Sequence, residues 1–142
     1  MNTTNTKTRN PIKSVVAYGD ALLAEMTRAW QARAETGIDW ERMADLSRPR
    51  FCEFVRHMSW RVIEIGGKPE YYDEGMRVLD QFLTLSGEML TSAPTESPGK
   101  SIERIRAAQA DVAIWRERFE KKKAESIDYS AKVRKLIEML CA

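Results

Sequence analysis

Residues 101–141 read SIERIRAAQADVAIWRERFEKKKAESIDYSAKVRKLIEMLC, a stretch that contains neither proline nor glycine. Its apolar residues recur at steps of three and four, which is the spacing of one face of an α-helix. The pattern weakens only at Lys122 and Ser126, where polar side chains occupy positions of the stripe. We therefore expect either one long helix that projects as an arm or a helical hairpin that turns back near residues 122–128.

The apolar stripe of this segment is too large to remain in water, so we expect it to be buried in a contact. The residues assigned to an oligomer or partner interface are Ile105, Val112, Trp115, Phe119, Tyr129, Val133, Leu136 and Leu140. The remainder of the same chain is one way to cover them, and a second subunit is another. Because residues 93–100 have the composition of a linker, the segment can reach a second subunit, and we expect a homo-oligomer.

The remainder of the sequence also predicts an all-α fold. A chain of 142 residues with 43% hydrophobic residues can form a core, and runs of alternating β-branched residues are missing. Four helices are expected before residue 93, with Asp39, Ser47 and Pro69 at helix starts and glycines 66 and 67 at a helix end. The expected organisation is a disordered tail at 1–9, a helical bundle at 10–92, a linker at 93–100 and the long helix or hairpin at 101–142.

One buried cluster is expected to join these helices, because each helix carries its own apolar stripe. Its predicted members are Trp30, Phe51, Val55, Met58, Leu79 and Phe82. The helix that begins at Pro69 has apolar residues on more than one face, so it is expected to be the central one.

Composition excludes several classes of protein. The formal net charge is only +2, which does not by itself require a polyanionic partner. The two cysteines, Cys52 and Cys141, are too few for a disulfide framework, and the first ten residues lack the apolar segment of a signal peptide. No window is long and apolar enough to span a membrane. We expect a cytoplasmic protein with no membrane partner.

Residues that carry chemistry are sparse. His57 is the single histidine. Successive residues of a helix are rotated by about 100°, so Cys52 lies on a different face of the same expected helix. The two side chains therefore cannot share a metal ion. No glycine-rich phosphate loop follows the spacing of a nucleotide site, and no serine or cysteine can be paired with the one histidine by sequence. The sequence therefore predicts no enzyme activity, no cofactor and no metal.

One segment has the pattern of a known motif. Residues 37–58, GIDWERMADLSRPRFCEFVRHM, resemble a helix-turn-helix in general, without resembling a particular family. The resemblance implies that the second helix reads DNA, and the candidate DNA-binding residues are Ser47, Arg48, Arg50, Arg56, His57 and Arg61. Glu41 and Asp45 depart from the motif, at positions that usually hold alanine and glycine. The simpler alternative is a short helix joined to a longer one inside a bundle.

The functional hypothesis that follows is a non-enzymatic α-helical binding, adaptor or regulatory protein. It oligomerises through its C-terminal helices and acts by binding another macromolecule, which the sequence does not identify. The alternative is a helix-turn-helix DNA-binding protein, either a regulator or a packaging-type protein, that uses the C-terminal region to oligomerise. The two hypotheses differ in whether the partner is a protein or DNA.

Overall fold

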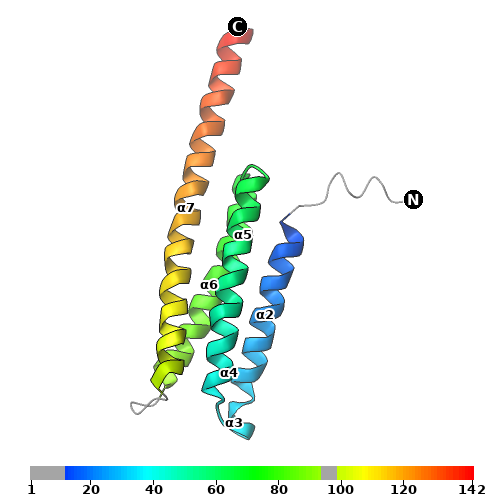
Figure 1. Cartoon of the computed structure of the whole chain (residues 1–142). Helices are drawn as coiled ribbons and strands as arrows, with labels where there is room; N and C mark the ends of the chain where they lie inside the picture. Colours follow the sequence, from blue (N-terminus) through cyan, green and yellow to red (C-terminus); the bar gives the residue numbers. More distant parts are fainter. Residues whose placement is uncertain (1–11, 94–98) are drawn as a thin grey trace, which may run out of the picture.

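A computed structural model describes residues 12–93 and 99–142, and all regular structure in these ranges is helical. Four rods lie side by side and form a bundle (Figure 1). Their elements are α2 (Lys13–Gln31) with the short α3 (Arg33–Thr36), α4 (Trp40–Asp45) with the kinked segment η1 (Leu46–Phe51) and α5 (Cys52–Glu64), α6 (Pro69–Ser92), and α7 (Gly99–Cys141). The all-α prediction is confirmed.

The second rod is made of α4, η1 and α5 placed end to end. Its first turn is capped as predicted, because the side chain of Asp39 accepts a hydrogen bond of 3.0 Å from the backbone N–H of Arg42. The rod is kinked at Arg48, the one residue inside η1 with non-helical backbone angles (φ −147°, ψ 119°). Arg48 precedes Pro49, whose ring disfavours helical angles in the residue before it.

The turn between α5 and α6 has the predicted chemistry. Gly66 and Gly67 have positive φ angles of 89° and 54°, which allow α5 to end within two residues. Pro69 then occupies the first turn of α6, where its missing N–H costs nothing. The hydroxyl of Tyr72 packs so closely over Gly67 that a side chain there would collide with it. The α5–α6 turn therefore requires glycine for two reasons, the positive φ angles and the close approach of Tyr72.

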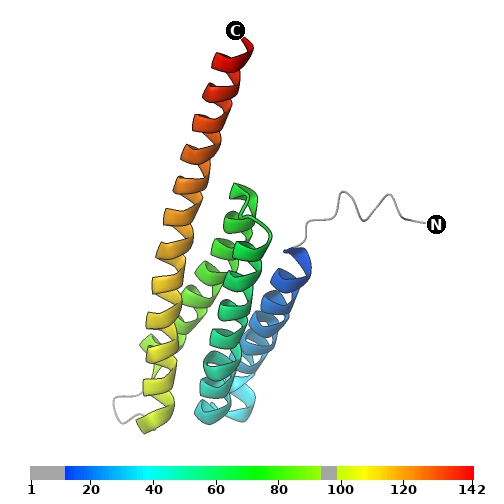
Figure 2. The same cartoon turned by 45° about the horizontal axis from the view of Figure 1, so that its top comes forward.

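The most extensive contact in the bundle is between α6 and α7, which run antiparallel beside each other (Figure 2). Gly75 leaves room for the ring of Phe119, and Tyr72 meets the same ring edge-on with centroids 5.8 Å apart. At the periphery, Arg116 pairs with Asp80 at 3.0 Å. Small and aromatic residues thus bring these two helices into close contact.

A single apolar core joins all four rods. The predicted cluster is confirmed, because all six of its members are buried in this core. Phe82 of α6 stacks on Phe51 with ring centroids 4.1 Å apart, and neither ring is exposed. The first half of α7 contributes Ile102, Ile105, Ala108, Val112 and Phe119 to the same core. The described residues on both sides of the expected linker therefore share one core.

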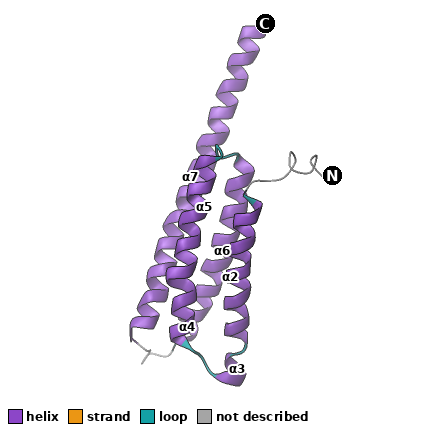
Figure 3. Ribbon diagram, turned by 45° about the vertical axis from the view of Figure 1, so that its right-hand side comes forward, coloured by secondary structure: helices purple, strands orange, loops and turns teal. Residues whose placement is uncertain are grey.

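The C-terminal segment is one continuous helix of 43 residues, so the alternative of a hairpin with a turn near residues 122–128 is wrong. The polar residues that suggested a break lie where the bundle ends. The hydroxyl of Ser126 donates a hydrogen bond of 3.0 Å to the carbonyl of Gly67, and Lys122 pairs with Glu125 at 3.5 Å. Beyond this level α7 continues alone as an arm (Figure 3). The predicted tail at 1–9 and most of the predicted linker at 93–100 lie outside the described residues.

Two glycines of α6 give a matched test of the α6–α7 packing. Gly75→Ala places a methyl group against the Phe119 ring, so we expect the protein to lose about 1–3 kcal/mol of stability. Gly87→Ala meets nothing closer than 3.5 Å, and we expect a gain of about 0.5–1 kcal/mol from helix propensity. Urea melts of both variants measure the difference. Equal effects of the two substitutions would contradict the packing described here.

Candidate functional site

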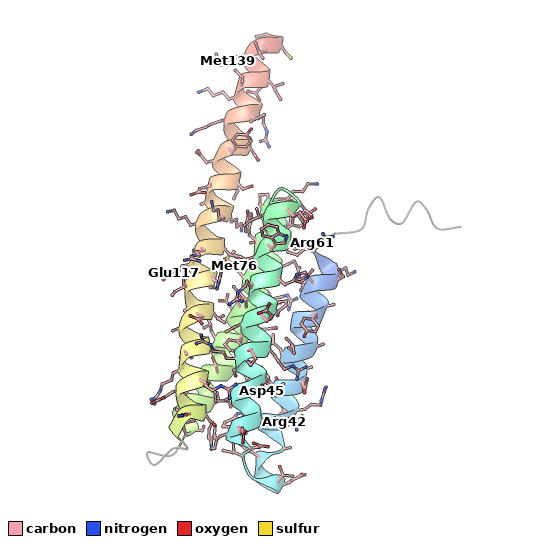
Figure 4. The ribbon with its side chains drawn as sticks, in the orientation of Figure 1. Arg42, Asp45, Arg61, Met76, Glu117 and Met139 are labelled. Carbon is pink, nitrogen blue, oxygen red and sulfur yellow. The ribbon has the colours of Figure 1, made fainter. Side chains whose placement is uncertain are left out.

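The most unusual surface of the molecule is the part of α7 beyond the bundle, residues 127–141, which we call the arm. Every residue in it is exposed. Figure 4 shows Met139 near its tip, far from the ends of the other helices. The large exposed apolar side chains of the arm are Ile127, Tyr129, Val133, Leu136, Ile137, Met139 and Leu140. Exposure reaches 70% for Tyr129 and 76% for Leu140.

The arm is amphipathic. Tyr129, Val133, Leu136 and Leu140 follow steps of four, three and four, so they lie on one face of the helix. In heptad notation Val133 and Leu140 occupy position a, and Tyr129 and Leu136 occupy position d. The charged residues of the arm are Asp128, Lys132, Arg134, Lys135 and Glu138. An apolar face of this kind is found on helices that pack against another helix.

A second apolar feature lies between α5 and α7, just below the level at which the arm leaves the bundle. It is an opening of about 280 Å³, which we call the groove. Its lining residues are Ser59, Val62, Ile63, Tyr72, Trp115, Arg118, Phe119, Lys121, Lys122 and Glu125. Ile63 is 68% exposed on the α5 side, and Trp115 is half-buried on the α7 side. The groove is therefore apolar on its walls.

Charged residues of the groove all come from α7. The guanidinium of Arg118 lies over the ring of Trp115, 4.8 Å from its centroid. Lys122 is paired with Glu125, and Lys121 adds a further positive charge at the rim. Burial raises the pKa of the Tyr72 hydroxyl, with a smaller opposing effect from Lys122. The groove thus has one acidic and three basic side chains around an apolar floor.

The structure divides the predicted interface residues into two groups. Ile105, Val112 and Phe119 are buried in the chain's own core, so assigning them to an intersubunit contact is corrected. The physical reason is that α6 and the α4–η1 segment cover the first half of α7. Trp115 lies at the groove, between the two groups. Tyr129, Val133, Leu136 and Leu140 are exposed on the arm, where nothing in the described chain covers them.

The candidate DNA-binding residues do not form one surface. Ser47 is fully buried and its hydroxyl donates to the carbonyl of Met43 at 2.8 Å, so its predicted roles as helix cap and DNA ligand are wrong. Arg48 faces α7, where it pairs with Asp111 at 3.5 Å. Arg50 faces α2, where it pairs with Glu25 at 3.3 Å. These two arginines therefore point to different sides of the rod.

The remaining candidates lie farther along α5. Arg56 pairs with Glu53 at 3.2 Å and Arg61 pairs with Glu64 at 3.5 Å, both within the same helix. His57 is exposed beside a shallow hollow that also contains Tyr18. Figure 4 shows Arg61 near the opposite end of the bundle from Arg42 and Asp45.

The arrangement of α4 and α5 also departs from the motif that the sequence resembles. In a helix-turn-helix the two helices meet at a large angle across a turn of three or four residues. Here α4 and α5 continue in the same general direction, and only Arg48 leaves the helical backbone conformation (Figures 1 and 3). The segment is a kinked bundle helix, which was the simpler alternative.

Cys52 is the one half-buried thiol among the described residues, and Cys141 is exposed on the arm. Burial raises the pKa of Cys52, the negative charge of Asp111 raises it further, and Arg48 and Arg56 oppose the rise. Within residues 12–93 and 99–142, no group of three or more His, Cys, Asp or Glu side chains is placed to hold a metal ion.

Sequence reasoning missed several residues of these surfaces. Ile127, Ile137 and Met139 are exposed on the arm but lie beside the strict three-four stripe. Ile63 follows Val62 in the sequence and is not part of the buried stripe of α5. The sequence did contain one signal for Ile63, Ile137 and Met139. Each is an apolar residue directly beside a residue of an already complete stripe, which indicates a second apolar surface. The groove itself has no sequence signal, because it depends on where α5 and α7 diverge.

Comparisons with protein-family models, curated proteins and solved structures found no match to this chain. In the part of the chain that the structure describes, none of the helices combines the length and apolar character needed to cross a membrane.

The two thiols give a direct test of this local geometry. At a pH near 8 we expect iodoacetamide to modify Cys141 well before Cys52, because a raised pKa leaves less of Cys52 as the reactive thiolate. Asp111→Asn should speed the labelling of Cys52, since it removes a charge that raises the pKa. Peptide mass spectrometry over time measures both rates. Equal labelling of the two thiols in the unmodified protein would contradict the described burial.

Proposed function

We propose that this protein is a non-catalytic α-helical binding protein that self-associates through its arm. The single observation that carries the proposal is the projecting amphipathic helix, residues 127–141, whose apolar side chains are all exposed. A monomeric protein rarely leaves a continuous apolar surface of this kind in water. Such a surface is typical of a contact with another macromolecule.

Burial of the arm supplies enough free energy for association. Each large apolar side chain contributes about 1.5–3 kcal/mol when it is fully removed from water. Association costs on the order of 4–15 kcal/mol in lost translational and rotational freedom. The apolar face of the arm has four such side chains, and a symmetric contact through it buries both copies of each. The arm is also already helical, so little further ordering is needed on binding.

Self-association would give the protein an adaptor's geometry. The arm is joined to the bundle by an unbroken helix, so two copies joined through their arms would hold two bundles at a defined separation. A partner with two attachment points would then bind both bundles, with an increased effective concentration at the second site. We propose that the second macromolecule is a protein and that it binds the bundle. DNA binding has less support, because all four candidate arginines are in ion pairs within the chain.

Two substitutions on the arm test self-association. Leu136→Glu puts a charge in the apolar stripe, and we expect it to shift the protein from an oligomer to a monomer in sedimentation velocity at tens of micromolar. Ala131→Glu adds the same charge to the polar face of the same helix and should leave the oligomer intact. Both positions are exposed, so neither change should disturb the bundle.

The proposal fails if the unmodified protein sediments as a monomer at this concentration. Circular dichroism melts of the two variants serve as the folding control, because both should retain the unmodified protein's helicity. A response to Ala131→Glu as large as the response to Leu136→Glu would show that charge, and not the apolar face, controls association.

A further inference from the structure

We propose that the groove between α5 and α7 is the receptor for the arm of a second copy of this chain, docked antiparallel. This inference rests on the proposed self-association and specifies its geometry. In the resulting dimer, each arm runs along the α7 of its partner toward the partner's bundle and places its tip in the groove. Each copy therefore supplies one arm and one receptor, and the contact is closed by a two-fold axis.

The first support is continuity between the groove and the arm. Trp115, Lys122, Tyr129 and Leu136 are spaced by seven residues, so they lie along the same face of α7. The first two line the groove and the last two are on the arm. A helix that lies in the groove can therefore continue along the apolar face of the arm. From residue 115 to residue 140 this surface is about 40 Å long.

The second support is the match between side chains in one register. A two-fold axis between residues 127 and 128 places Leu140 opposite Trp115 of the second copy and Leu136 at the level of Phe119, whose buried ring belongs to the core and lines the groove only from below. The groove has an opening of about 280 Å³, roughly twice the 150 Å³ cavity that holds a benzene molecule. The groove therefore has space for two large apolar side chains, and this register places two there, Leu136 and Leu140.

The third support is charge complementarity at the edges of the contact. In antiparallel helix pairs, heptad position g of one helix lies beside position g of the other. The proposed register pairs Glu125 with Lys132 of the second copy, twice by symmetry, and places Arg118 beside Met139. No two like charges meet at positions e or g in this register.

Neighbouring registers lack this complementarity. A shift of one heptad in one direction places Lys132 beside Lys132 of the second copy, and a shift in the other direction places Glu125 beside Glu125. A parallel pair that extends to the level of the groove brings Arg118 beside Lys123, whereas a parallel pair of the arms alone leaves the groove uncovered. Like charges placed directly opposite each other are unfavourable, so the antiparallel register with its axis at residues 127 and 128 is preferred.

Disulfide trapping tests the register directly. In a background with Cys52→Ala and Cys141→Ala, a chain with Glu125→Cys and Lys132→Cys should form covalent dimers rapidly under mild oxidation. The matched control combines Glu125→Cys with Ala131→Cys, because residue 131 faces away from the contact, and it should cross-link at least about tenfold more slowly. Equal rates for the two pairs would overturn the proposed register.

The native thiol separates the two orientations. With Cys141 intact and Cys52→Ala, an antiparallel dimer keeps the two Cys141 residues about 40 Å apart, and no disulfide-linked dimer should form. A parallel pair of arms would bring them together at the tip. Rapid oxidation to a Cys141-linked dimer would therefore overturn the proposal in favour of a parallel coiled coil.

A groove variant tests the receptor without altering the arm. Ile63→Glu puts a charge on the exposed wall of the groove, and we expect it to weaken dimerisation at least about tenfold. Tyr18→Glu is the control, since Tyr18 is a half-exposed residue of α2, and α2 does not contact α7.

The outcomes distinguish this inference from the proposed function. If Leu136→Glu dissociates the protein but Ile63→Glu does not, self-association stands and the groove is not the receptor. If the unmodified protein is a monomer, both proposals fail. Dissociation by Leu136→Glu and Ile63→Glu, with preferential cross-linking between residues 125 and 132, supports the antiparallel dimer.

Discussion

The close packing of α6 against α7 is the contact on which the remainder of the structure depends. Phe119 approaches the backbone of α6 because Gly75 has no side chain, and Tyr72 holds the other edge of the same ring. This contact fixes the longitudinal position of α7 in the bundle. It therefore also fixes the level at which α7 loses its neighbours and the arm begins. A helix of 43 residues that begins at the end of the bundle where its antiparallel neighbour of 24 residues stops must extend beyond the other end.

One apolar stripe consequently has two environments. Its first half is covered by the chain's own helices, with Val112 fully buried, whereas the second half, including Leu140, is exposed. The polar positions Lys122 and Ser126 lie at the boundary, where Ser126 bonds to the α5–α6 turn. The stripe, the groove beside Trp115 and the arm lie along one helix, so self-association through the arm would bring a second copy directly to the groove.

The segment that resembles a helix-turn-helix shows why a residue pattern can fit two structures. Buried positions at Ala44, Leu46, Phe51 and Phe54 satisfy the motif and a kinked bundle helix equally well. What separates the two is the direction of the second helix and the partners of its arginines. Arg48 bonds across to α7 and the rod continues past the kink, so these side chains join bundle helices instead of gathering on one surface.

The sequence by itself determined the all-α class, the helix starts at Asp39 and Pro69, the glycine turn after α5, and the membership of the buried cluster, because periodicity and backbone preferences are local properties. It also predicted the stripe of α7 and the exposed half of the candidate site. Only the tertiary structure decided that α7 is continuous, that Phe119 belongs to the core and that Ile63 lines a groove. Which side chains are buried, and where two helices leave a groove between them, depends on which elements lie side by side. That arrangement is set by contacts between residues that are distant in the sequence.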